Sequence, residues 1–159
     1  MRSFTLRLQK QSQRPVIALH DWHHFGAMLD TGALYPIWVR EERILQEMGA
    51  EIIQDQVSFG GFGGEATGKL YQMPFFQLGE LIYPGLCVIA HKLDLPCHMI
   101  VSATMFSKLR YEIDDENHAL NVTIPDGQSN VRNLVIEDRD RKLHVFCTSG
   151  ENMNLSRLV

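Results

Sequence analysis

The sequence predicts an all-β fold, a closed and mostly antiparallel β barrel with two short helices. Three observations support this prediction. Apolar and polar residues alternate along most of the 159-residue chain, turn residues separate many short alternating runs, and only two segments show helical spacing. A chain of this length is expected to bury a core of its own, and no solenoid repeat or low-complexity segment interrupts it.

The first predicted strands lead to an acidic residue. Residues 4–8 and 15–20 are predicted strands, and residues 21–24 form the turn that follows them. Residues 25–29 are apolar or glycine throughout, which is typical of a buried strand. This third strand runs directly into Asp30.

Helical spacing replaces the alternation at two places. Residues 36–49 are predicted to form a short helix with Pro36 near its start and Gly49 as its stop. A second short helix is predicted over residues 103–109. Ser102, at the end of a short buried strand, is a suitable N-cap for it.

A glycine-rich segment, residues 58–65, lies between two alternating runs. The runs at residues 51–57 and 67–76 are predicted to pair as a hairpin around it. Glycine has no side chain to restrict the backbone, so the end of this hairpin is expected to be mobile.

The chain has one candidate for an appended element. Residues 1–124 are expected to form the main domain, and residues 125–159 a C-terminal hairpin extension that follows a Pro-Asp-Gly turn. Its predicted strands are residues 131–136 and 143–148. We expect the extension to pack on the same domain or at a dimer interface.

Composition and charge exclude several classes of function. The net charge is -4 and no basic stripe with interleaved aromatic residues occurs, so nucleic acid is not the expected partner. No apolar run approaches the roughly 20 residues that span a bilayer, and residues 1–8 lack the apolar core of a signal peptide. The three cysteines have no metal-type spacing and lie among apolar residues, which favours reduced thiols and a cytoplasmic location.

Asp30-Thr31-Gly32 is the candidate catalytic motif. Two carboxyl groups that share one proton can hydrolyse a peptide bond without a metal or cofactor, because one accepts a proton from water while the other donates one. Asp30 is presented from the end of a buried strand, Thr31 can fix the loop, and Gly32 lets its own N–H approach the carboxylate. The same triplet is also an ordinary turn. Because it occurs once, a two-carboxylate site requires a second chain.

The residues around the triplet resemble those of retropepsin-like, or retroviral-type, aspartic proteases. Residues 15–19 and 25–33 resemble the start of that family, spacing included, and the glycine cluster lies where the family carries a flap. Residues 99–103 resemble its apolar-apolar-glycine segment, although Ser102 replaces the usual glycine. The resemblance covers about residues 14–124 and is closest to small bacterial single-domain members.

The resemblance implies a retropepsin-like acid-protease barrel and specific roles for some residues. Asp30 matches the catalytic aspartate, Thr31 the threonine that interlocks with its counterpart, and Gly32 the turn glycine. Ala33 stands where pepsin-like members usually have serine. That hydroxyl would stabilise the ionised carboxylate, so its loss predicts a mildly acidic to neutral pH optimum. The flap residues, together with Ala33, are expected to bind substrate; they are Gly60, Gly61, Phe62, Gly63 and Gly64.

The predicted function is therefore an aspartic endopeptidase that works as a homodimer on peptide or protein substrates, without a cofactor. A histidine-rich turn at His20, His23 and His24 offers too few ligands at metal spacing, so no metal site is predicted. Two alternatives remain open. One is a catalytically silent dimer of the same fold that binds peptide or protein, and the other is an enzyme of the same acid–base type that cleaves a non-peptide amide or ester.

Overall fold

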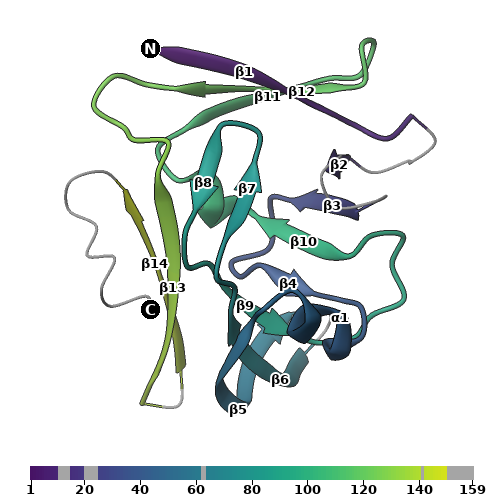
Figure 1. Cartoon of the computed structure of the whole chain (residues 1–159), viewed down its shortest axis with the longest axis vertical. Helices are drawn as coiled ribbons and strands as arrows, with labels where there is room; N and C mark the ends of the chain where they lie inside the picture. The colour runs from purple at the N-terminus through teal and green to yellow at the C-terminus, as the bar shows by residue number, and fades with distance from the viewer. Residues whose placement is uncertain (11–14, 20–24, 62–63, 141, 150–159) are drawn as a thin grey trace.

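The computed structural model describes residues 1–10, 15–19, 25–61, 64–140 and 142–149. This part of the chain is mostly β and contains one seven-stranded sheet, one three-stranded sheet and two strand pairs (Figure 1). The predicted all-β class is correct, but the described residues form no closed barrel. The large sheet is open, with β2 and β5 at its two ends. Alternation predicts strands with one buried face, and this pattern is shared by barrels and by open sheets packed on one core.

The seven-stranded sheet carries the Asp30 segment near its centre. In spatial order its strands are β2 (Val16–Leu19), β3 (Phe25–Asp30), β10 (Met99–Ser102), β4 (Ile37–Trp38), β9 (Cys87–Ala90), β6 (Gly64–Gln72) and β5 (Glu51–Gly61).

Strand β10 lies between the two strands that flank the Asp30 loop. It pairs in parallel with β3 and in antiparallel with β4, so β3 and β4 run in opposite directions on either side of it. The connection from Asp30 to Ile37 therefore crosses over the end of β10. All four β10 residues are completely buried, which makes this strand a rigid support for the loop above it.

The remaining strands surround this sheet (Figure 1). The three-stranded sheet has the order β1 (Arg2–Arg7), β12 (Ala119–Ile124) and β11 (Arg110–Asp114), and β7 (Phe76–Leu78) pairs with β8 (Leu81–Tyr83). The C-terminal hairpin, β13 (Arg132–Arg139) and β14 (Lys142–Ser149), runs along one side of the molecule. β13 contacts β8 and β9, while β14 contacts β5. The division of the chain at residue 124 stays a prediction.

The two helical segments differ from their predictions. The predicted helix over residues 36–49 is an α helix only at α1 (Glu42–Glu47), and Gly49 follows its cap with a φ of 91°. Ile37 and Trp38 are strand residues instead, because their backbone completes the ladder between β10 and β9. The predicted second helix is a 3-10 helix, η2 (Ala103–Phe106), so a second α helix is not confirmed.

One apolar core joins the large sheet to the smaller ones, and it includes Trp38, Tyr71, Phe76 and Phe106. Cys87 and Cys97 are buried and Cys147 is half-buried, and all are free. Within the described ranges, no helix combines the length and the apolar character needed to cross a membrane.

Candidate active site

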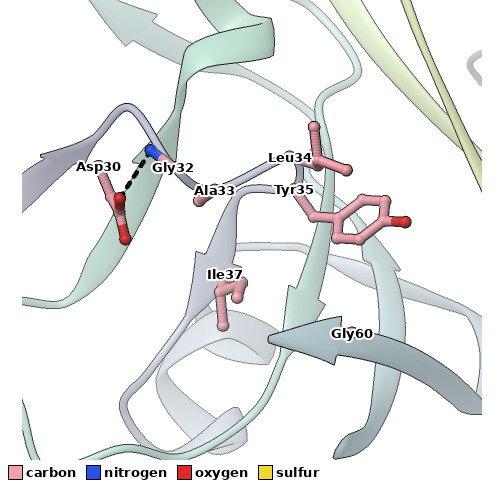
Figure 2. Close-up of a pocket in the computed structure, with 7 residues that line it drawn as sticks. All are labelled: Asp30, Gly32, Ala33, Leu34, Tyr35, Ile37 and Gly60. Atoms are coloured by element: carbon pink, nitrogen blue, oxygen red, sulfur yellow. Dashed lines mark hydrogen bonds between the residues drawn. The ribbon is translucent and has the colours of Figure 1, made fainter. Parts of the chain in front are cut away.

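Asp30 is the last residue of β3 and is half-buried, whereas the five residues before it are buried. Its Oδ1 accepts a hydrogen bond of 2.9 Å from the Gly32 N–H (Figure 2). Thr31 and Gly32 themselves are exposed. The end of a buried strand therefore presents a carboxylate to solvent, with a backbone donor that holds its orientation.

The absence of a side chain at Gly32 leaves room for the Asp30 carboxylate. A Cβ added at Gly32 would lie 3.3 Å from Asp30 Oδ1, which is closer than most real Cβ contacts. With a side chain there, the carboxylate would have to shift by a few tenths of an ångström. The sequence-based reason for this glycine, access of its N–H to the carboxylate, agrees with the geometry.

The loop after Asp30 is attached to the end of β10. Ser102 is the register partner of Asp30, and the Ala103 N–H donates to the Ala33 carbonyl oxygen at 3.3 Å. The Thr104 hydroxyl donates to the Leu34 carbonyl oxygen at 2.6 Å. Sequence reasoning compared residues 99–103 with the apolar-apolar-glycine segment of a family but did not identify Thr104, because its partner lies 70 residues away.

A pocket of about 370 Å³ opens beside the Asp30 carboxylate (Figure 2). Its volume is at the small end of ligand sites, which suits one or two side chains of an extended ligand rather than a large cofactor. Asp30 is the one carboxylate among its lining residues, and the rest of the lining is mostly apolar. The lining residues are Asp30, Gly32, Ala33, Leu34, Tyr35, Ile37 and Gly60.

Of the predicted flap residues, some are described by the structure, and one of these lines the pocket. Gly60, near the end of β5, lines the same pocket as Asp30. Gly61 and Gly64 pair with each other where β5 and β6 meet, so the strands extend further into the glycine cluster than predicted. Phe62 and Gly63 lie outside the described residues. A Cβ at Gly60 or Gly64 would meet no atom within 4 Å, so these glycines leave open space on the surface of the hairpin.

Tyr35 connects the pocket to the C-terminal hairpin. Its phenol donates a hydrogen bond of 3.3 Å to the Leu143 carbonyl oxygen in β14, and partial burial raises its pKa. A second contact to the same hairpin comes from β5, where Gln54 donates to Asp138 of β13 at 2.9 Å. Sequence reasoning missed Tyr35, since no local pattern links two residues that lie 108 positions apart.

Metal ligands do not gather at the described site. In the described ranges, no three His, Cys, Asp or Glu side chains lie together in a way that could hold an ion. The histidine-rich turn at residues 20–24 lies outside those ranges. The chemistry that the described residues support is acid–base chemistry at the Asp30 carboxylate.

Comparison with known proteins adds one structural similarity. No family model matches the chain, and no curated protein matches it. Among solved structures, the chain is similar to a retropepsin-like aspartic protease from Rickettsia conorii, with a TM-score of 0.49 and 12% sequence identity over 76% of this chain and 89% of that one. A similarity of this size carries no conclusion about function, so the proposal below rests on the residues of this chain.

Proposed function

We propose that this protein is an aspartic endopeptidase that acts as a homodimer, with Asp30 of each chain in one shared site. The observation that carries the proposal is the setting of Asp30. A buried strand presents this single carboxylate, the Gly32 N–H orients it, and it borders a mainly apolar pocket that the β5–β6 hairpin helps to line.

The single carboxylate is the reason for the dimer. The described pocket contains one acid group, whereas metal-free hydrolysis of an amide needs both a proton acceptor and a proton donor. A two-fold axis beside Asp30 would bring its copy close, and the exposed Thr31 would then be free to contact its counterpart.

The pair of carboxyl groups would hold one proton, because two negative charges about 3 Å apart strongly disfavour each other. The ionised group takes a proton from water as the water oxygen attacks the scissile carbonyl carbon. The protonated group gives its proton to the carbonyl oxygen. The tetrahedral intermediate then collapses and its C–N bond breaks. The carboxyl group that took the proton from water gives it to the leaving nitrogen, and the other carboxylate takes back a proton from a hydroxyl of the intermediate as the product carboxylic acid forms.

The substrate would lie as an extended segment between the Asp30 loop and the β5–β6 hairpin. An extended peptide can pair with exposed backbone, while pockets for alternate side chains select among sequences. The pocket lined by Leu34, Tyr35 and Ile37 would then take an apolar side chain near the scissile bond.

The proposal is tested by cleavage of a peptide library and measurement of the dimer mass, for the wild type and for Asp30→Asn. The wild type is expected to be a dimer that cleaves apolar sites. Asp30→Asn is nearly isosteric, so it should form the same dimer and unfold with a free energy within about 0.5 kcal/mol of wild type. Its kcat/KM should fall about 10⁴-fold or more, as when a central catalytic group is removed.

Other outcomes separate the alternatives. An active monomer, or full activity in Asp30→Asn, would contradict the mechanism. A wild-type dimer that binds peptides without cleaving them would identify a silent binding protein. Hydrolysis of small esters or amides but of no peptide would identify the non-peptide enzyme.

A further inference from the structure

We propose that the hydroxyl groups of Ser102 and Thr104 form a two-step hydrogen-bond relay that positions the Asp30 loop for catalysis. Both are positioning residues, since neither hydroxyl touches the carboxylate in the contacts described above. The proposal rests on the peptidase function proposed here.

The direction of the relay follows from the number of protons available. Ser102 Oγ and Thr104 Oγ1 are 2.7 Å apart, and Thr104 Oγ1 is 2.6 Å from the Leu34 carbonyl oxygen. A carbonyl oxygen can only accept, so the single Thr104 proton points to Leu34. Ser102 must therefore donate to Thr104. The hydrogen-bond chain runs outward, from the buried strand end to the loop.

Ser102 is a fixed starting point for this chain. It is completely buried and lies opposite Asp30 in the β10–β3 ladder. As the N-cap of η2 it makes no side-chain bond to the helix backbone, contrary to the capping role predicted from the sequence. A buried hydroxyl without a partner costs about 1–3 kcal/mol, so the bond to Thr104 also satisfies Ser102.

Two described hydrogen bonds connect η2 to residues 33 and 34 of the Asp30 loop. Leu34 is 61% exposed, and Thr31 and Gly32 are also exposed, so little packing holds the outer side of the loop. On the inner side, the Ala103 N–H bond to Ala33 is long at 3.3 Å. The Thr104 bond to Leu34 is much shorter, so the relay supplies the shorter of the two described hydrogen bonds between η2 and the loop.

A displaced loop would slow the chemical step more than it weakens substrate binding. A misplacement of about 1 Å in a catalytic group can lower the rate about 100-fold. Thr104→Val keeps the shape of the side chain but cannot donate, so kcat should fall roughly 30- to 100-fold with KM changed less than about threefold. Thr104→Ser keeps the donor and should retain most of the activity.

A double-mutant cycle tests the relay as a unit. Ser102→Ala should lower kcat about 10-fold, because Thr104 loses the donor that fixes its rotamer. Once Thr104 is valine, Ser102 has no link to the loop. The double variant should then be no slower than Thr104→Val alone, whereas two independent effects would multiply. The shape of the pH–rate profile should not change, since both carboxylates remain.

Amide hydrogen exchange gives a readout that does not depend on peptidase activity. Exchange at Gly32 and Ala33, whose N–H groups bond to Asp30, should become faster in Thr104→Val and stay near the wild-type rate in Thr104→Ser. If the wild type cleaves no peptide but this exchange pattern is seen, the peptidase function fails and the relay stands. Multiplicative losses of kcat, a Thr104→Ser variant as slow as Thr104→Val, or unchanged exchange would overturn the relay.

Discussion

Asp30 and Arg132 carry single charges in opposite environments. Asp30 is half-buried, faces a pocket and accepts a hydrogen bond from the Gly32 N–H. Arg132 in the C-terminal hairpin is 1% exposed, and its Nε and Nη1 have no hydrogen-bond partner among the described residues. The Asp30 charge is accessible to a ligand, whereas the Arg132 charge is enclosed by the hairpin and its neighbours.

The hairpin is fastened by buried polar contacts around Arg132. Its Nη2 donates to the Ser107 carbonyl oxygen and lies 3.4 Å from the Cys147 sulfur. Nearby, the Tyr83 phenol donates to the Met105 carbonyl oxygen at 2.8 Å, and burial strongly raises its pKa. Asn133 accepts the Gly85 N–H at 2.8 Å. These contacts connect β13 to the turn after β8 and to the end of η2. Substitutions here should therefore affect stability more than activity.

Arg132 gives the largest expected effect on stability. Arg132→Ala should lower the free energy of unfolding by about 3 kcal/mol, because a long packed side chain is replaced by a cavity. Arg132→Met keeps the apolar stem and removes the two unpaired donors together with the Nη2 bond to Ser107, so it should cost less than the alanine variant, about 1 to 2 kcal/mol. Urea unfolding measures both. A methionine variant as unstable as the alanine variant would show that the guanidinium, rather than its stem, holds the hairpin.

A substitution of Gly60 tests the pocket beside Asp30, the first of the two regions compared. A valine at this position meets open space and suits a strand, so Gly60→Val should fold as stably as wild type. Because Gly60 lines the pocket, the new side chain should raise KM about 10-fold for substrates with a bulky apolar residue. Gly64→Val is the matched control, since it also meets open space but does not line the pocket. Equal effects of the two variants in steady-state kinetics would contradict this assignment.

His98 is a third case, a partly buried group that the fold keeps neutral. Its Nδ1 accepts the Gly26 N–H at 3.1 Å, and its pKa is lowered by burial and by the nearby charge of Arg40. An unperturbed histidine has a pKa of about 6.5. As the pH falls through that value, His98 therefore takes up a proton in the unfolded chain before it does so in the folded chain. The contribution of His98 to stability is full above that range and is lost as the pH falls toward its lowered pKa.

The prediction is a pH-dependent difference in Tm between wild type and His98→Asn, whose side-chain oxygen can still accept the Gly26 N–H. The wild type should lose more Tm than the variant between neutral pH and about pH 5. A difference in Tm that does not vary with pH would show that His98 does not titrate in this way.

Tyr35 joins the two regions, and its substitution has the smallest expected effect. Tyr35→Phe removes one hydrogen bond of 3.3 Å to Leu143 and keeps the ring in the pocket wall. We expect a loss of stability below about 1 kcal/mol and a change in KM of about twofold to threefold for substrates that fill the pocket. The change in KM would be detected by kinetics with peptides that carry either Phe or Ala as the side chain that enters the pocket. A change in kcat alone would contradict a role in the pocket wall.

The parts of the fold that could be predicted are those with a local signal. The buried run before Asp30, the short reach from Gly32 and the β5–β6 hairpin all show in neighbouring residues. Ile37 and Trp38 were assigned to a helix because Pro36 and the following charges suit a helix start. Their strand state comes from pairing with β10 and β9, which lie far along the chain.

In the candidate site, too, only the residues with a local sequence signal could be predicted. Asp30 could be identified from its motif, but Tyr35 and Thr104 act through partners 108 and 70 residues away. Ser102 was visible as a departure from glycine, yet its bond to Thr104 depends on the 3-10 turn that follows β10. Closure of the barrel could not be decided either, because alternation reports which face is buried and not whether the end strands meet.

The central claim is that two chains contribute one Asp30 each to a single site. The most direct test mixes a fixed amount of wild type with Asp30→Asn under conditions in which the subunits exchange. If every active site needs two aspartates, an equal amount of the variant should lower the total activity to about half, and a threefold excess to about one quarter, because mixed dimers are inactive. Activity that stays constant as the variant is added would show that one chain is sufficient.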